Sequence, residues 1–217
     1  MRVRLGLVAA LTACLCACGS SQSKPVGPPK VTSFELNSKL LGFPLQEVLV
    51  TPAGGGKGRP LLVFLHGYGG TPIGTLSPAF LAALRKLGDR EPNVLLPEGD
   101  VGWWHDHEGG RWGTYVMREA IPAALKRTGA DSNSIAIGGI SMGGFGALDL
   151  GRLDAKRFCA VGGHSPAVAE ADSAEAALGF DGEADFKRHD VIGDARTHSP
   201  YDSPVWLDVG DHDALRP

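Results

Sequence analysis

The stretch that decides the fold is Ile135-Ala-Ile-Gly-Gly-Ile-Ser-Met-Gly-Gly-Phe-Gly-Ala147. A short apolar run, typical of a buried strand, enters Gly139-Ile-Ser141-Met-Gly143, and a helix-like segment follows. This is the layout of a nucleophile elbow, where a sharp turn between strand and helix lifts a serine hydroxyl clear of the sheet. Glycines are needed beside the serine because a Cβ there would collide with neighbouring backbone. The stretch predicts a serine-dependent acyl hydrolase with Ser141 as nucleophile.

The Gly-x-Ser-x-Gly pattern alone is weak in a chain with 31 glycines. The competing interpretation is a glycine-rich turn with an incidental serine. The context favours the elbow, because residues 135–137 form an apolar strand-like run before it. After it, Phe145, Leu148 and Leu150 follow at spacings that a buried helix tolerates, and no proline occurs before Pro166.

Length and composition indicate one globular domain. A chain of 217 residues is long enough for an α/β domain with a substantial core. Hydrophobic residues make up 43% and charged residues 21%, which is ordinary for a globular protein. The net charge of −3 leaves no basic footprint, so we expect no nucleic-acid partner. Cys159 lies in an apolar run and is expected to be a buried free thiol.

The N-terminus resembles an export signal. Residues 1–18 combine a basic start, an apolar segment of signal-peptide length and a sequence similar to a bacterial lipobox. We expect lipidation at Cys18, with Cys14 as the alternate, and an ordinary cleaved signal peptide as the competing interpretation. Residues 19–30 form a polar, proline-containing tether, and residues 31–217 form the catalytic domain. The expected location is therefore a bacterial cell envelope, with membrane attachment through the lipid; secretion is the alternative.

Apolar runs and helix signals alternate along the domain, which predicts a mostly parallel sheet with helices on both faces. In such sheets, ligands bind beyond the carboxyl ends of the strands. We expect strands at 47–51, 61–65, 93–96, 135–137, 158–161 and 204–209, and helices at 77–87, 111–127 and 142–152.

The loop Leu65-His-Gly-Tyr-Gly-Gly70 follows a buried strand and fits an oxyanion loop. A tetrahedral intermediate needs backbone N–H groups fixed where its negative charge develops. We assign these to Met142, the residue after the nucleophile, and to Tyr68, with Gly67 as second choice. A phosphate-binding loop is disfavoured because the Gly-Lys-Ser/Thr sequence is absent. His66 is expected to have a structural role within the loop.

An acidic turn ends the last expected strand, in the sequence Trp206-Leu-Asp-Val-Gly-Asp-His-Asp213. A carboxylate there would orient a catalytic histidine and stabilise its imidazolium. Asp213 is the preferred acid, Asp211 and Asp208 are alternates, and a solvated acidic turn is the competing interpretation.

The order expected for this architecture is serine, acid, histidine, yet no histidine follows Asp213 in the 217 residues. His212 adjoins the acid, and His164, His189 and His198 precede it, so we expect surface or structural roles for them. The expectation is that the sequence stops short of the natural C-terminus, without a last strand and helix. An inactive relative of an enzyme is the second explanation.

A further polar stretch, Gly102-Trp-Trp-His-Asp-His-Glu108, follows a strand end. Trp103, Trp104 and His105 are candidate pocket residues, because the indoles offer large apolar surfaces. His105 and His107 have the composition of a metal site but no third ligand at a diagnostic spacing. We therefore expect no metal ion here, and nothing in the sequence indicates a cofactor.

Taken together, these motifs resemble the esterase D-like putative esterases, which include S-formylglutathione hydrolases, feruloyl esterases and mycobacterial mycolyltransferases. The resemblance extends over about residues 48–216 and implies an α/β-hydrolase fold with Ser141 as nucleophile and Asp213 as acid. The stretches that carry it are Gly-Ile-Ser141-Met-Gly-Gly-Phe-Gly-Ala147, His66-Gly-Tyr-Gly-Gly70, Trp112-Gly-Thr-Tyr-Val-Met-Arg-Glu-Ala-Ile-Pro122, Ala130-Asp-Ser-Asn-Ser-Ile-Ala-Ile-Gly138 and residues 158–165.

The function that follows is hydrolysis of a small-molecule, lipid or carbohydrate ester through an acyl-enzyme on Ser141. Transfer of the acyl group to a sugar or lipid alcohol is the first alternative. A non-catalytic binding protein of the cell envelope is the second, because the histidine of the triad is missing. The departure from the family pattern predicts impaired activity for these 217 residues.

Overall fold

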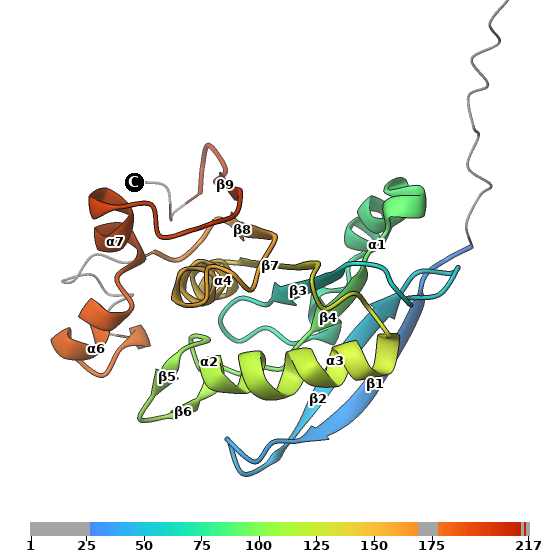
Figure 1. The fold of residues 1–217 in the computed structure, drawn as a ribbon. Coiled ribbons are helices and arrows are strands. Elements are labelled where there is room, and N and C mark those ends of the chain that lie inside the picture. Colours follow the sequence, from blue (N-terminus) through green and yellow to red (C-terminus); the bar gives the residue numbers. More distant parts are fainter. Residues whose placement is uncertain (1–26, 169–177, 214, 216–217) are drawn as a thin grey trace, which may run out of the picture.

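A seven-stranded sheet runs through the centre of the computed structural model, which describes residues 27–168, 178–213 and 215 (Figure 1). The strand order is β1-β2-β4-β3-β7-β8-β9. The first two strands in the chain pair antiparallel with their neighbours, and all other pairs are parallel. The strands are β1 Lys30–Asn37, β2 Pro44–Thr51, β3 Leu61–Leu65, β4 Asn93–Leu96, β7 Ile135–Ile140, β8 Ala160–His164 and β9 Val205–Asp208.

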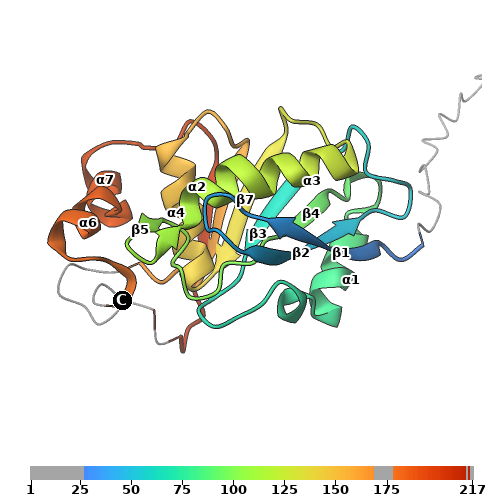
Figure 2. The ribbon, with the colours of Figure 1, turned by 90° about the horizontal axis from the view of Figure 1, so that it is seen from below.

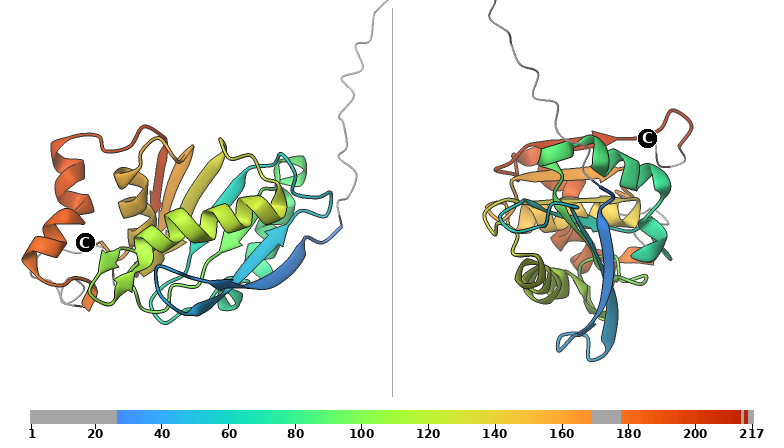
Figure 3. Two further views of the ribbon diagram at one scale, coloured as in Figure 1. Left: turned by 60° about the horizontal axis from the view of Figure 1, so that its bottom comes forward. Right: turned by 90° about the vertical axis from the view of Figure 1, so that its right-hand side faces the viewer.

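Helices cover both faces of this sheet, as the sequence predicted. Helix α1 packs on one face, while α2, α3 and α4 pack on the other (Figures 1 and 2). Helices α6 and α7 lie together at the end of the molecule beside α4 (Figure 3). The helices are α1 Pro78–Lys86, α2 Trp112–Tyr115, α3 Ile121–Thr128, α4 Met142–Leu153, α6 Glu183–Arg188 and α7 Val191–Thr197, and shorter elements are the 3-10 turns Ile73–Thr75 and Gly88–Arg90 and the hairpin strands β5 Asp106–His107 and β6 Gly110–Arg111.

The long helix expected over 111–127 is interrupted. A π-helical turn, Val116–Ala120, separates α2 from α3, and Pro122 lies in the first turn of α3. Proline lacks an N–H, and its ring clashes with the preceding helical turn. The wider π turn accommodates Pro122, so the helical segment continues from α2 into α3. Ser77 caps α1 as predicted, because its side chain accepts a hydrogen bond from Phe80 N–H at 3.0 Å.

Strand β3 explains why the sheet needs two covered faces. Its residues Leu61, Val63 and Leu65 are fully buried in the cluster under α2, α3 and α4. Leu62 and Phe64 alternate with them and pack toward α1. A continuous apolar strand is expected where both faces are covered.

Two details differ from expectation. Strand β1 was not predicted, and it pairs with β2 along its whole length. Cys159 is exposed rather than buried, because its position just before β8 turns Phe158 into the core and the thiol outward. Among the described residues, no helix is both long enough and apolar enough to cross a bilayer. The proposed leader, 1–18, lies outside the described residues.

Candidate active site

Ser141 stands at the carboxyl edge of the sheet, between β7 and α4. Its backbone has φ 54° and ψ −120°, a strained conformation for a residue with a side chain. Ser141 N–H donates to His164 O at 3.0 Å, and Ala167 N–H donates to Ser141 O at 3.0 Å. These two hydrogen bonds to the segment at the end of β8 stabilise the strained backbone of Ser141. The turn has the form predicted for a nucleophile elbow.

Two glycines make this turn sterically feasible. A Cβ added to Gly139 would lie 2.2 Å from Gly143 O and 2.8 Å from Leu65 O. A Cβ on Gly143 would lie 2.1 Å from Leu65 O. These are backbone atoms that cannot rotate away, so the close packing of β3, β7 and α4 requires glycine at both positions.

The loop after β3 lies directly against the serine. A Cβ built on Gly67 would be 3.4 Å from Ser141 Cβ and 3.9 Å from its Oγ. The backbone hydrogen bond within this loop runs from Gly70 N–H to Gly67 O. The N–H of Tyr68 has no acceptor among the described residues. Met142 is the first residue of α4, where a helical N–H has no partner one turn earlier. Both N–H groups are therefore available to an oxyanion.

His66 holds the oxyanion loop in place. Its Nδ1 lies 2.8 Å from Gly67 O and its Nε2 lies 3.1 Å from the N–H of Gly99. Nδ1 therefore donates and Nε2 accepts, which fixes the neutral tautomer of the ring. The ring is buried, and Trp104 Nε1 donates to His66 O at 3.1 Å. The structural role predicted for His66 is confirmed.

Asp213 lies beside the loop that leaves β8. Ser165 Oγ donates to Asp213 Oδ2 at 2.6 Å, and Leu215 N–H donates to Oδ1 at 2.8 Å. These bonds, that of Ser165 first, lower the pKa of Asp213. Ser165 and Ala167 belong to one short segment, and Ala167 also bonds to Ser141. Asp213 and Ser141 therefore border the same segment at one edge of the sheet.

Among the described residues, no histidine is hydrogen-bonded to Ser141. His164 Nδ1 faces the carboxylate of Asp208 at 2.9 Å, which engages the alternate acid. His198 contacts Thr197 Oγ1 at 2.9 Å, and His212 is exposed. His105 and His189 belong to a buried cluster of their own. The structure thus brings together a serine, an oxyanion loop and an acid, without a base at the serine.

All three candidate pocket residues, Trp103, Trp104 and His105, are buried, and His105 lines a cavity of about 580 Å³ together with residues of α4. Trp104 is fully buried and cannot present a surface to a ligand, because its ring fills the space left by Gly99 and Gly146. Trp103 is 4% exposed, with its ring centroid 6.4 Å from that of Tyr68. Trp103 therefore packs beside Tyr68 of the oxyanion loop, and the prediction that Trp104 lines a pocket is wrong.

A hollow adjoins the oxyanion loop on the face of the sheet that carries α1. This cavity of about 580 Å³ is lined by loop residues 66–71 together with Ile140, Phe64 and Phe80. Its walls are mixed, with loop backbone on one side and apolar side chains on the other. Such a hollow beside Gly67 offers room for part of an ester substrate.

These features define the class of protein. A mostly parallel sheet covered on both faces, a strained serine between strand and helix, and a glycine-rich loop after β3 are the parts of an α/β-hydrolase fold. A family model described as Putative esterase matches residues 48–216. The chain belongs to this esterase family.

Solved structures of several esterases and hydrolases share the fold. A ferulic acid esterase is similar with a TM-score of 0.74 and 22% identity, over 87% of this chain and 81% of its own. An S-formylglutathione hydrolase from Agrobacterium tumefaciens gives 0.69 and 21%, over 87% and 78%. The fluorophosphonate-binding serine hydrolase F of Staphylococcus aureus gives 0.67 and 16%, over 87% and 82%. The predicted fold and family resemblance are confirmed, and the comparison with curated proteins gave no match.

Proposed function

We propose that the chain cleaves carboxylic esters through an acyl-enzyme on Ser141. The observation that carries the proposal is the juxtaposition of the strained serine, the N–H of Met142 at the start of α4 and the loop that carries the N–H of Tyr68. Membership of the esterase family supports an ester as the substrate class.

In this mechanism Ser141 Oγ attacks the ester carbonyl, and the alcohol leaves with the proton that a base took from the serine. The tetrahedral oxyanion accepts hydrogen bonds from the N–H groups of Met142 and Tyr68, and water then hydrolyses the acyl-enzyme. Loss of one such donor costs about 10²–10³ in kcat in serine hydrolases. A preformed hole therefore contributes much of the rate even before the base is considered.

The base is the part that the described residues do not supply at Ser141. We therefore expect slow turnover from the 217-residue chain, at most the roughly 10³–10⁴-fold over water that survives loss of a triad member. The proposal that a histidine encoded after Pro217 completes the triad stays a prediction. Reading the codons that follow Pro217 tests it directly.

The decisive experiment replaces the base from solution. Hydrolysis of p-nitrophenyl acetate is measured with increasing imidazole, alongside labelling by a fluorophosphonate probe. We expect imidazole to accelerate both reactions with saturation, because the free base can occupy the position beside Ser141. After the hydrolysis that imidazole causes without protein is subtracted, Ser141→Ala should abolish labelling and the imidazole-dependent rate. Ser132→Ala is the matched control, since this exposed serine lies in the turn before β7, at the opposite end of that strand from Ser141, and should leave both rates within about twofold of wild type.

The result that would overturn the proposal is an imidazole-dependent rate in Ser141→Ala equal to that of wild type. A well-folded wild-type chain without labelling at any imidazole concentration would favour the binding-protein alternative instead. Adding an alcohol and analysing the products separates hydrolysis from acyl transfer, because an acceptor alcohol would yield a new ester.

We also propose that the chain is exported and anchored by a lipid on Cys18. The support is the sequence of residues 1–18, with its basic start, apolar segment and lipobox-like end. Metabolic labelling with a fatty-acid analogue in a bacterial host should mark the wild type and not Cys18→Ser. Labelling that is lost only in Cys14→Ser would move the anchor to the alternate cysteine.

A further inference from the structure

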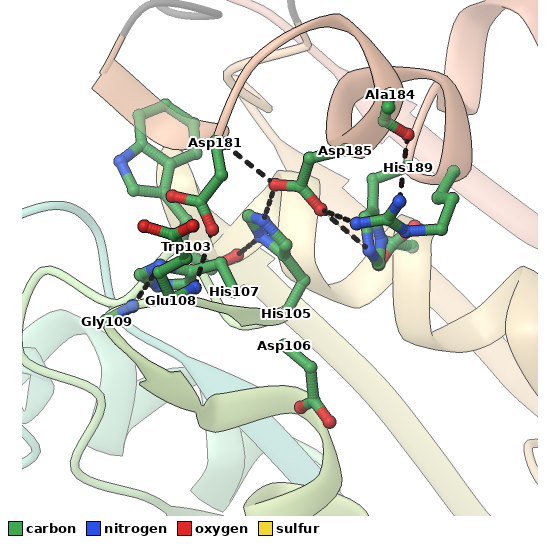
Figure 4. Close-up of polar contacts among 12 residues, drawn as sticks. Trp103, His105, Asp106, His107, Glu108, Gly109, Asp181, Ala184, Asp185 and His189 are labelled. Atoms are coloured by element: carbon green, nitrogen blue, oxygen red, sulfur yellow. Dashed lines mark hydrogen bonds and ion pairs between the residues drawn. The ribbon is translucent and has the colours of Figure 1, made fainter.

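A second group of reactive side chains lies buried at the far side of α4 from the sheet. His105 comes from the loop before β5, Asp185 from α6, and His189 from the residue that follows α6. One ligand atom from each of the three lies within 4.8 Å of the others, and all three side chains are buried. Figure 4 shows the Asp185 carboxylate between the two imidazoles.

Both imidazoles are held from behind through Nδ1. His189 Nδ1 lies 2.8 Å from Asp149 Oδ2, and His105 Nδ1 lies 3.3 Å from Trp103 O. Each Nδ1 faces an acceptor, so each must carry the hydrogen. In a neutral ring the other nitrogen, Nε2, is then a bare lone pair. Carboxylate or carbonyl support at one nitrogen is the usual arrangement of histidines that bind a metal through the other.

Both Nε2 atoms face the same carboxylate. His105 Nε2 lies 3.3 Å from Asp185 Oδ2, and His189 Nε2 lies 3.9 Å from Asp185 Oδ1. Asp185 is held as an anion by Arg188, at 2.7 Å, and by Asp181 N–H, at 3.0 Å. The Nε2 lone pairs of the two imidazoles therefore point at the Asp185 anion. This arrangement is unfavourable unless a proton or a cation lies between them.

Two protonated imidazoles are an unfavourable solution to this convergence. The ring centroids of His105 and His189 are 4.4 Å apart, where two positive charges would repel in a buried setting. In the part of the chain that the structure describes, Asp149 and Asp194 pair with Arg152, and Asp185 pairs with Arg188.

We propose that His105 Nε2, His189 Nε2 and the Asp185 carboxylate bind a divalent transition metal of the zinc class. Two imidazoles and one carboxylate form a donor set that suits Zn²⁺. In a tetrahedral site with bonds of 2.0–2.1 Å, neighbouring ligand atoms lie about 3.3 Å apart. His105 Nε2 and Asp185 Oδ2 are separated by this distance, 3.3 Å.

The fourth position and the role follow from the surroundings. His105, Asp149 and His189 also line a cavity of about 580 Å³ that can supply a water ligand. The three ligands come from segments up to 80 residues apart, so the ion would clamp α6 to the loop before β5 and, through Asp149, to α4. The site is thereby a structural clamp separate from Ser141. His107 is excluded as a ligand because Nε2 bonds to Gly102 O and Nδ1 accepts from Gly109 N–H.

The sequence alone predicted no metal here, because His105-x-His107 shows no third ligand nearby. The fold supplies two ligands from the distant segment 185–189. This proposal therefore revises that expectation and is independent of the esterase mechanism.

The test uses the whole chain, freed of metal by a chelator and titrated with Zn²⁺ and then with Co²⁺. We expect one ion per chain in competition with a chromophoric chelator. The Co²⁺ form should show the visible spectrum of a four-coordinate nitrogen and oxygen site. A hundredfold excess of free Zn²⁺ over Kd should raise Tm by about 5–10 °C.

Variants separate the ligands from their neighbours. His105→Gln, His189→Gln and Asp185→Asn should each lower the Zn²⁺ affinity about 100-fold or more, and Asp149→Asn about 10–100-fold. His107→Gln is the matched control and should leave the affinity unchanged. Circular dichroism of each metal-free variant checks folding, while the wild-type Co²⁺ spectrum does not depend on any variant.

Three results would overturn the proposal. The first is no stoichiometric binding by a folded wild-type chain. The second is a Co²⁺ spectrum with thiolate charge-transfer bands, which would place the ion on cysteines. The third is Zn²⁺ affinity that is insensitive to His105→Gln and His189→Gln in folded variants.

Discussion

The edge of the sheet at Ser141 and the buried cluster around Asp185 are built by opposite means. At Ser141 the proposed chemistry depends on the backbone, through a strained φ of 54°, two N–H groups for which the described residues supply no acceptor, and glycines packed against carbonyl oxygens. Around Asp185 the proposed metal site is formed by side chains, namely two imidazoles and a carboxylate whose outer partners are Asp149, Arg152 and Arg188 and whose charge a bound cation would balance. One site depends on the absence of side-chain volume, and the other depends on balanced charge.

This difference predicts how each region fails. A backbone site is destroyed by a single added methyl group and tolerates changes in the side chains around it. A charged buried site tolerates small changes in volume but not the loss of one partner, because an unpaired charge is left without solvent. The following predictions test both halves of the comparison.

The largest effect is expected from Gly139→Ala. The new methyl would lie 2.2 Å from Gly143 O and 2.8 Å from Leu65 O, so either α4 or β3 must shift. We expect the free energy of unfolding to fall by about 3 kcal/mol, measured by urea denaturation. Fluorophosphonate labelling of Ser141 in imidazole should be lost, because the shift separates Ser141 from Gly67.

Gly138→Ala is the matched control, one residue earlier in the same strand. Its methyl would meet Gly162 O at 3.5 Å and Phe64 at 3.8 Å, which are ordinary contacts. Its stability should be unchanged or up to about 1 kcal/mol higher, because alanine loses less backbone entropy than glycine on folding. Equal losses in the two variants would show that the elbow does not depend on close backbone approach.

Two buried carboxyls sharpen the charge half of the comparison. Glu47 and Asp185 are 0% and 2% exposed, yet their pKa values move in opposite directions. Burial raises the pKa of Glu47 to about 8, and the hydrogen bonds from the Tyr115 hydroxyl and the backbone of Glu98 offset only part of this effect. Burial also acts to raise the pKa of Asp185, but Asp181 N–H and the two histidines outweigh it and lower the value. Partners, and not burial alone, set the direction of each pKa shift.

A pH series with Glu47→Gln tests this. Folded Glu47 keeps its proton up to about pH 8, while the unfolded carboxyl releases it near 4.5. The folded state binds the extra proton in this window, so wild-type stability should fall as pH rises from 4.5 toward 8, by up to about 1.4 kcal/mol per pH unit. Glu47→Gln should remove this slope. Urea unfolding at pH 5, 6, 7 and 8 measures this slope. The control is Glu35→Gln, on the exposed face of β1. Parallel plots of unfolding free energy against pH for the wild type and both variants would contradict the assignment.

The same distinction explains what the sequence could predict. The elbow and the oxyanion loop are formed by consecutive residues, so Ser141, Met142 and Tyr68 could be located from local pattern. Helix α1 could be placed because Ser77 and Pro78 are strong local start signals. Strand β1 was missed because its alternating residues follow directly on a polar tether and resemble a continuation of it.

The buried cluster could not be predicted, since contacts across 80 residues leave no local spacing. The interpretation of Trp104 failed for a related reason. An aromatic residue after a strand end can line a pocket or fill the core. In this chain the Trp104 ring enters the core because Gly99 and Gly146 leave space for it. That space forms only when the segments that carry Gly99, Trp104 and Gly146 come together in the fold.

The smallest effect is expected from Tyr68→Ala, although Tyr68 is assigned to the oxyanion hole. Its side chain is 56% exposed and only its backbone N–H takes part in the proposed chemistry. The rate of fluorophosphonate labelling in imidazole should therefore change by less than about tenfold, and the stability by about 0.5 kcal/mol. Tyr68→Pro removes the backbone N–H itself, so it should slow fluorophosphonate labelling by a factor of about 10²–10³. If the alanine variant instead lost as much rate as the proline variant, the phenol would be the functional group, and the site at Ser141 would depend on side chains as the buried cluster does.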